Sequence, residues 1–182
     1  MSSVKIFELL EVLDSLKHLK RTGWVKMGVP EPETVACHMY RMAVLAMSLE
    51  KQIDIDIYRT VRMCLVHDIA EALVGDITPY CGVSEEDKHS MEHEGIKKIA
   101  SFVPAIGEDW MTLWMEYEKQ ETFTAKVVKH LDKFDMTSQA HTYEKKYGID
   151  LSQFFETTKN VFTIEPFVQW DKEMRELRDK KL

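Results

Sequence analysis

The sequence predicts an all-α fold in one domain. Apolar residues recur at steps of three and four along almost the whole chain, which is the spacing of an amphipathic helix. Only 7 glycines and 5 prolines occur in 182 residues, too few for the many tight turns of an all-β fold. No internal repeat or Ser/Gly linker divides the chain, so we expect residues 1–182 to form a single helical bundle.

The first fifty residues predict two helices. The first begins at Ile6 and is expected to end before Gly23. Residues 29–32 contain two prolines and must form a loop, because each proline excludes helical backbone at the residue before it. Thr34 then has the side chain and the position to cap a second helix that extends to Leu49.

A third helix is expected from Ile57 to Leu73. Asp54 or Asp56 can cap its N-terminus, and Gly75 marks its end. A turn-rich stretch follows at residues 76–82. Further helices are expected at residues 84–102, 110–117, 124–147, 151–159 and 166–180. Residues 6–147 carry the motifs described below, and the helices of residues 151–180 are expected to pack on them.

Charge and hydropathy limit the partners and the compartment. The formal net charge of −7 disfavours a nucleic-acid polymer as the main partner. No stretch approaches the roughly 20 apolar residues that span a bilayer, and the charged N-terminus does not resemble a signal peptide. Three widely spaced cysteines without a CxxC pair indicate free thiols in a reducing compartment. We expect a cytoplasmic protein, with the nucleus as the alternative.

The densest group of chemically active residues lies near the end of the third expected helix. His67, Asp68 and Glu71 follow one another within one helical turn, in an otherwise apolar run. Buried carboxylates need partners, and a ring nitrogen with carboxylates is a donor set for Zn, Mn, Fe or Co. These residues supply too few ligands by themselves, so a metal site here needs others from elsewhere. A His-Asp pair alone is more typical of an ion pair at a helix end, because the dipeptide is common by chance.

Further residues extend this pattern across three helices. His38 lies in the second helix, and Asp132 lies in the long later helix. The order His, His-Asp, Asp resembles that of the HD-domain metal-dependent phosphohydrolases. Longer matches look like the eukaryotic HD-domain 5'-deoxynucleotidases, which are similar to the bacterial YfbR-like enzymes. These matches are Arg21-Thr-Gly-Trp24, His38-Met-Tyr-Arg41-Met, Leu65-Val-His-Asp-Ile-Ala-Glu71 and Val74-Gly-Asp-Ile-Thr-Pro79.

The resemblance implies two cation sites. The first would be held by His38, His67, Asp68 and Asp132 and would take Mn, Co, Zn or Fe. The second, for Mg or Mn, would be held by Glu71, Asp76 and the carbonyl of Ile77. Glu71 and Asp76 are also implied in orienting the attacking water and in protonating the leaving oxygen. A divalent cation lowers the pKa of bound water toward ~7, and the chain shows no nucleophile motif, so direct attack by water is expected.

The resemblance also implies a substrate, a deoxyribonucleoside 5'-monophosphate, and a homodimer. Arg21 would grip the phosphate, because a guanidinium can bind two of its oxygens. Trp24 would wall the sugar or stack on the base. Asp76, Ile77, Thr78 and Pro79 complete the expected substrate contacts. Asp135, one turn after Asp132, either supports the site or lies at the surface.

Three other interpretations remain open from the sequence. One is a phosphodiesterase acting on cyclic nucleotides or oligonucleotides. The second is a mixed-valent di-iron oxygenase, which requires additional histidines near Glu71 that the chain lacks. The third is a non-catalytic dimer module that a metal stabilises.

Overall fold

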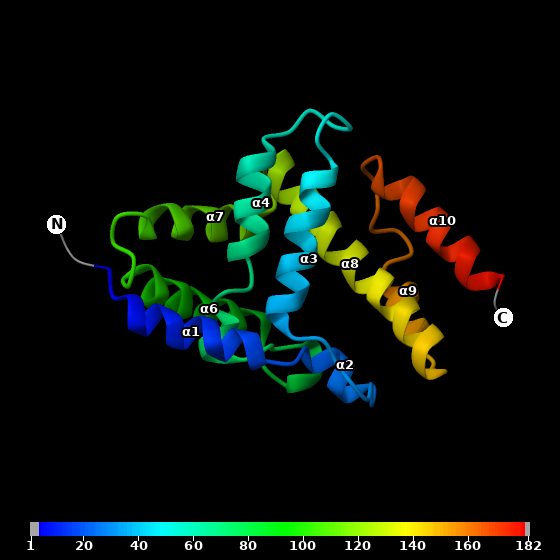
Figure 1. Ribbon diagram of the computed structural model, residues 1–182, viewed down its shortest axis with the longest axis horizontal. Helices are drawn as coiled ribbons and strands as arrows, with labels where there is room; N and C mark the ends of the chain where they lie inside the picture. Colours follow the sequence, from blue (N-terminus) through cyan, green and yellow to red (C-terminus); the bar gives the residue numbers. More distant parts are fainter. Residues whose placement is uncertain (1–3, 181–182) are drawn as a thin grey trace.

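The computed structural model describes residues 4–180, and it confirms the all-α prediction (Figure 1). Within these residues there is no strand, and the only strand-like pairing is a single antiparallel bridge between Lys20 and Thr34. The elements are α1 (Ile6–His18), α2 (Thr22–Lys26), α3 (Val35–Ser48), α4 (Ile57–Val66), α5 (Glu71–Val74), the 3₁₀ turn η1 (Pro79–Cys81), α6 (Glu85–Ala100), α7 (Gly107–Lys119), α8 (Phe123–Tyr147), α9 (Ser152–Thr157) and α10 (Phe167–Asp179).

Helices α3, α4 and α8 pack against one another and form the centre of the molecule (Figure 1). Their facing sides are apolar and fully buried, with Met42 on α3, Met63 on α4 and Leu131 on α8 among the largest side chains. Helix α1 packs on α3, and α7 packs on both α4 and α8. Burial of these apolar faces supplies the main driving force for bringing the three central helices together.

The C-terminal helices α9 and α10 pack on α8, which is 25 residues and about 37 Å long. They share a second apolar cluster with α2, in which Trp24, Tyr143 and Phe155 are buried. In Figure 1 this part of the molecule lies at the end of α8 away from α7. The cluster therefore fixes α2 and α9 on the same side of the central helices.

Side-chain caps begin several helices where the sequence places them. Thr34 accepts a hydrogen bond from the Cys37 amide at the start of α3, and Ser84 accepts one from the Asp87 amide at α6. At α4 the capping residue is Asp56, the second of the two candidates. The cap of α8 is Thr122, so this helix begins one residue earlier than expected.

The first helix ends before Gly23, as predicted, but a separate short helix that the spacing did not predict follows it. Helix α1 ends at His18, and the chain then runs extended through Leu19 to Arg21. This segment pairs with the loop before α3, because Arg21 N donates to Glu33 O (3.0 Å) and Val35 N donates to Leu19 O (2.9 Å). Gly23 lies inside the separate helix α2. A long-range pairing therefore separates the first helix from α2.

The third expected helix is interrupted after Val66. In a continuous helix the Cys64 carbonyl would accept from the Asp68 amide, but here it accepts from the His67 ring at 2.9 Å. The following amides bond three residues back, as from Glu71 N to Asp68 O (3.0 Å), and a new short helix α5 begins at Glu71. Gly75 ends it with φ +85°, a conformation that suits glycine.

Among residues 4–180, no helix combines the length and the apolar character needed to cross a membrane.

Candidate metal centre

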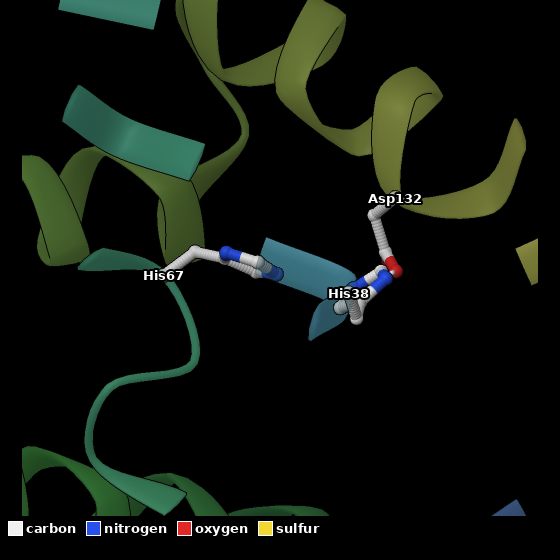
Figure 2. A group of neighbouring side chains, drawn as sticks. All are labelled: His38, His67 and Asp132. Carbon is white, nitrogen blue, oxygen red and sulfur yellow. Dashed lines mark ion pairs between the residues drawn. The ribbon is translucent and has the colours of Figure 1, made fainter. Parts of the chain in front are cut away.

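Three central helices bring two imidazoles and a carboxylate to one buried point. His38 comes from α3, His67 caps the C-terminus of α4, and Asp132 lies in α8 (Figure 2). One ligand atom from each lies within 4.8 Å of the others, and all three residues are buried. Because the central helices pack on one another, these side chains meet although 94 residues separate the first from the last.

Asp68 joins the same group from the turn after α4. Its Oδ2 lies 3.1 Å from His67 Nε2 and 3.8 Å from His38 Nε2. His38 Nε2 is also 3.4 Å from Asp132 Oδ1. The structure thus places together the four side chains that the sequence proposes as one ligand set.

The two imidazoles are oriented so that each leaves one nitrogen for a cation. His67 Nδ1 donates to the Cys64 carbonyl, which can only accept, so Nε2 is the unprotonated nitrogen when the ring is neutral. Both Nε2 atoms are buried and make no hydrogen bond to any described residue. Buried polar atoms without partners are costly. Two imidazole nitrogens facing two carboxylates are therefore a donor set that fits a divalent cation.

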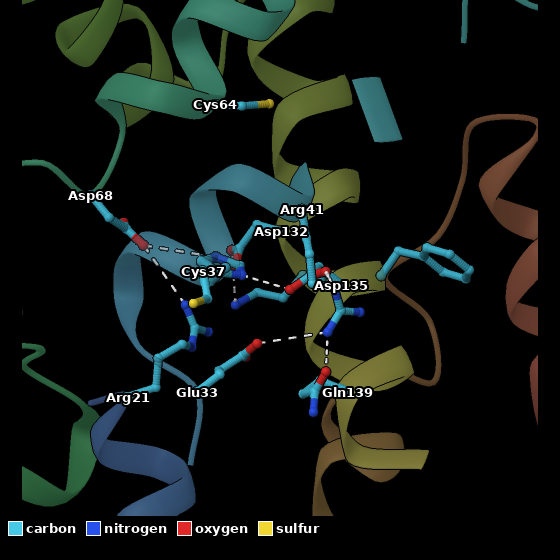
Figure 3. Close-up of polar contacts among 12 residues, drawn as sticks. Arg21, Glu33, Cys37, Arg41, Cys64, Asp68, Asp132, Asp135 and Gln139 are labelled. Carbon is cyan, nitrogen blue, oxygen red and sulfur yellow. Dashed lines mark hydrogen bonds and ion pairs between the residues drawn. The ribbon is translucent and has the colours of Figure 1, made fainter. Parts of the chain in front are cut away.

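Asp135 holds the ring of His38 from behind. Its Oδ2 lies 2.8 Å from His38 Nδ1, and its Oδ1 forms an ion pair with Arg41 Nε at 3.0 Å (Figure 3). Arg41 also donates to Gln139 and forms an ion pair with Glu33 at 3.6 Å. A carboxylate on the far nitrogen fixes the tautomer and raises the basicity of a metal-binding histidine. The sequence left open whether Asp135 supports the site or lies at the surface. Its side chain is completely buried against His38, so it supports the site.

Replacing Asp135 by asparagine is expected to weaken divalent-metal binding by about 10- to 100-fold, the usual effect of removing such a partner. The amide keeps the size of the side chain but loses its charge, so His38 is held less firmly. Titration of metal-free protein with Mn²⁺, followed by equilibrium dialysis, measures the change. An affinity equal to that of the unmodified protein would show that Asp135 does not support the site.

Neighbouring basic side chains keep the two acidic members of the cluster ionised. Burial by itself would raise the pKa of Asp132, but Lys133 and His38 hold it well below its usual range. Burial likewise opposes ionisation of Asp68, and the adjacent His67 outweighs it and lowers the pKa of that carboxyl. Both carboxylates are therefore charged at neutral pH and able to bind a cation.

Glu71 lies next to this cluster in a different electrostatic environment. Burial raises its pKa well above the usual range, and the nearby charges of Asp68 and Asp76 raise it further. Its Oε2 is buried and has no hydrogen-bond partner among the described residues. The interruption after Val66 does not separate it from the cluster, since His67, Asp68 and Glu71 all line one cavity.

Asp76 is anchored to the start of α2. Its Oδ2 accepts from the Thr22 amide at 2.6 Å, and its carbonyl accepts from the Thr22 hydroxyl at 2.7 Å. Ile77 is buried behind it, while Thr78 and Pro79 continue along the cavity wall. One carboxylate oxygen of Asp76 is thus committed to the backbone, and Oδ1 is the atom left to meet a ligand.

Arg21 points from the start of α2 toward the cluster. Its side chain is only 15% exposed, and Nη1 lies 3.8 Å from Asp68 Oδ2 (Figure 3). Burial disfavours its charge, but Asp132, Asp68 and Asp76 together raise its pKa. A guanidinium held in this position is available to an anion that reaches the cation site.

One cavity of about 390 Å³, a size typical of small-molecule sites, is lined by Arg21, His67, Asp68, Glu71, Asp76 and Asp132. Three lysines also line it: Lys88, Lys129 and Lys133. Lys133 Nζ is 3.3 Å from Asp132 Oδ2, and Lys129 Nζ is 3.6 Å from the same atom. Neither Lys129 nor Lys133 is among the site residues that the sequence motifs indicate. Both could have been found from the sequence, because Lys129 precedes Asp132 by three residues and Lys133 follows it directly on the same helix.

A family model described as an HD domain matches residues 13–167, most of the chain. The protein belongs to the HD-domain family. This HD-domain protein is 40% identical over 168 residues to a Dictyostelium discoideum protein named 5'-deoxynucleotidase HDDC2, covering 85% of this chain and 88% of the relative. It is 39% identical over 181 residues to the Homo sapiens protein of the same name, covering 97% and 88%.

A solved structure of a conserved hypothetical protein from Pyrococcus furiosus is also similar to the HD-domain protein. The TM-score is 0.76 at 30% identity, over 93% of this chain and 99% of the other. The two proteins therefore share the arrangement of their helices over nearly the whole chain. The predicted resemblance to HD-domain proteins is confirmed over most of the chain.

Proposed function

We propose that this HD-domain protein is a metal-dependent 5'-deoxynucleotidase, which hydrolyses deoxyribonucleoside 5'-monophosphates to deoxyribonucleoside and phosphate. The observation that carries the proposal is the buried cluster of His38, His67, Asp68 and Asp132, opening on a cavity with Arg21 at its wall. The relatives named 5'-deoxynucleotidases support the substrate class, because the similarity covers most of both chains.

Two cation sites are part of the proposal. His38, His67, Asp68 and Asp132 would hold a first cation, for which nitrogen and oxygen donors suit Mn, Co, Zn or Fe. Glu71, Asp76 and the carbonyl of Ile77 would hold a second, and oxygen donors alone suit Mg or Mn. When bound, the cations supply positive charge to the phosphate and activate the attacking water.

The side chains of the protein bind the phosphate and move the protons. A phosphate dianion is repelled by the carboxylates of the cavity, and Arg21 offsets this repulsion where the cations do not reach. Lys129 and Lys133 add positive charge on the α8 side. Glu71, whose pKa is raised by burial and is therefore more basic than an ordinary carboxylate, would take a proton from water. Asp76 would orient the water, and one of the two acids would return a proton to the leaving 5'-oxygen.

A phosphate-release screen tests the proposal directly. Metal-free protein would be mixed with Mn²⁺, Co²⁺ or Mg²⁺ and offered deoxyribonucleoside and ribonucleoside 5'-monophosphates and cyclic nucleotides. We expect phosphate release from the deoxyribonucleoside monophosphates that depends on the added cation and stops with a chelator. Opening a cyclic nucleotide yields a nucleoside monophosphate and no phosphate, so this reaction is followed by chromatography of the product. Turnover of cyclic nucleotides alone would favour a phosphodiesterase, and no turnover of any substrate with any cation would favour a non-catalytic, metal-stabilised module.

The homodimer and the cytoplasmic location stay predictions. Exposed apolar side chains on the outer faces of α1 and α3, such as Leu10 and Tyr40, are compatible with a contact between two copies.

A further inference from the structure

The cavity beside the proposed metal ligands becomes less polar along helix α8. Four side chains of α8 line it at spacings of three and four residues: Lys129, Asp132, Lys133 and Met136. This row covers about 10 Å of the helix. The lysines and Asp132 occupy its first part, whereas Met136 continues it toward the end of α8 on which α9 packs. The cavity therefore has a charged end at the cluster and a less polar end near α9.

Helix α9 forms the wall of this second end. Gln153, Phe154 and Thr157 line the cavity, and they come from a part of the chain that carries none of the sequence motifs. Phe154 lies against α2, where a Cβ placed on Gly23 would be 3.7 Å from the phenyl ring, an ordinary contact distance. The close approach of α2 and α9 thus positions the ring beside the cavity.

Phe154, rather than Trp24, is the ring that a ligand can reach. The two rings are in contact, with centroids 4.5 Å apart and planes at 44°. Trp24 is only 1% exposed, and its indole N–H donates to Glu33 at 3.0 Å. Tyr143 covers its edge at a centroid distance of 5.4 Å. Both rings line the cavity, but Trp24 is almost wholly covered and backs Phe154, which is half-buried and presents the more accessible face.

Polar groups lie at the rim beside this ring. Tyr80, in the turn η1, donates from its hydroxyl to Gln153 Oε1 at 3.4 Å, so η1 and α9 meet there. Lys26 holds η1 in place by donating to the Tyr80 carbonyl at 2.7 Å. The side chains of Tyr80 and Gln153 both line the cavity, and each can donate and accept hydrogen bonds.

We propose that Phe154, with Tyr80 and Gln153 at its rim, forms the subsite for the nucleobase of the substrate. This inference rests on the proposed function, which puts the phosphate at the metal cluster. A 5'-nucleotide bound that way directs its base away from the charged end, toward the ring. Stacking suits every base because each has a flat π-face, and rim groups that donate and accept do not select one base. The subsite would therefore favour nucleotides over sugar phosphates without strong base preference.

The test compares substrates with and without a base. Phe154→Leu keeps an apolar side chain against Trp24 but removes the aromatic face, and Phe154→Tyr restores it. For Phe154→Leu we expect KM for deoxyribonucleoside monophosphates to rise by about 5- to 100-fold, the loss typical of one base–aromatic stack. Its kcat and KM for 2-deoxyribose 5-phosphate should not change. Phe154→Tyr should behave like the unmodified protein.

A matched control and a folding check complete the experiment. Glu156→Ala alters an exposed residue of the same helix that does not line the cavity, and it should leave both substrates unaffected. Thermal unfolding of each variant reports loss of packing. Equal effects of Phe154→Leu on both substrates, or no effect on either, would overturn the base subsite. Failure of the unmodified protein to hydrolyse any nucleotide would instead overturn the proposed function.

Discussion

Replacing Glu71 by glutamine is expected to lower turnover of a deoxyribonucleoside monophosphate by about 10²–10⁴, the range for loss of a general acid or base. Glutamine has nearly the same shape but cannot take up or release a proton. Because Glu71 lies outside the cluster of His38, His67, Asp68 and Asp132, the variant should still bind one cation per chain. Steady-state kinetics together with metal analysis of the purified variant measures both quantities.

A second buried acid provides the control for this result. Glu92 lines the same cavity, and burial raises its pKa to about 7, although Lys88 opposes the shift. Glu92→Gln therefore removes a comparable buried carboxylic acid that has no role in the proposed reaction, and turnover should change by less than about 3-fold, far below the loss expected for a general acid or base. If excess Mg²⁺ restored the Glu71→Gln variant, Glu71 would hold a cation and not move protons.

Replacing His67 by alanine is expected to abolish the stabilisation of the fold by added metal. It should also reduce turnover at least as strongly as replacing Glu71 does. For the unmodified protein, a free cation concentration of 100 times the dissociation constant should stabilise the fold by about 2.7 kcal/mol. For a chain of this size that corresponds to a rise in Tm of roughly 5–10 °C. The variant lacks one of two buried imidazole nitrogens, so the rise should largely disappear.

Thermal unfolding with and without Mn²⁺ is the measurement, and it does not depend on knowing the substrate. His89→Ala is the matched control, because His89 is half-exposed on α6 and pairs with Glu118, outside the cluster. This control should keep the full metal-dependent rise. A His67→Ala variant that gained as much Tm from Mn²⁺ as the unmodified protein would rule out His67 as a ligand.

Much of the fold could be predicted because it depends on local signals. Thr34, Asp56 and Ser84 cap helices in the structure, and the apolar spacing correctly indicated that the chain is helical. A cap and a repeat of three to four residues act over a single turn, so they can be recognised without knowing the tertiary structure. The predicted helix ends were less accurate, and α7 at Gly107–Lys119 is longer than expected on both sides.

The errors arose where a distant or unusual contact outweighed the local pattern. Helix α2 forms as a separate helix because the segment between it and α1 pairs with the loop before α3. Helix α4 stops after Val66 because the His67 ring occupies the Cys64 carbonyl. Neither contact has a signature in residue spacing, so the pattern alone indicated neither the separate helix α2 nor the break after Val66.

By itself, the sequence determined that the chain is helical and which residues form the candidate metal site, through the order of His38, His67-Asp68 and Asp132. Only the tertiary structure decided what surrounds that site. Asp135 supports His38 across a separation of 97 residues, and α9 brings Phe154 to the cavity beside Trp24. The physical reason is that helix formation depends on neighbours within a turn or two, whereas burial, pKa and cavity shape depend on side chains that only the packing of helices brings together.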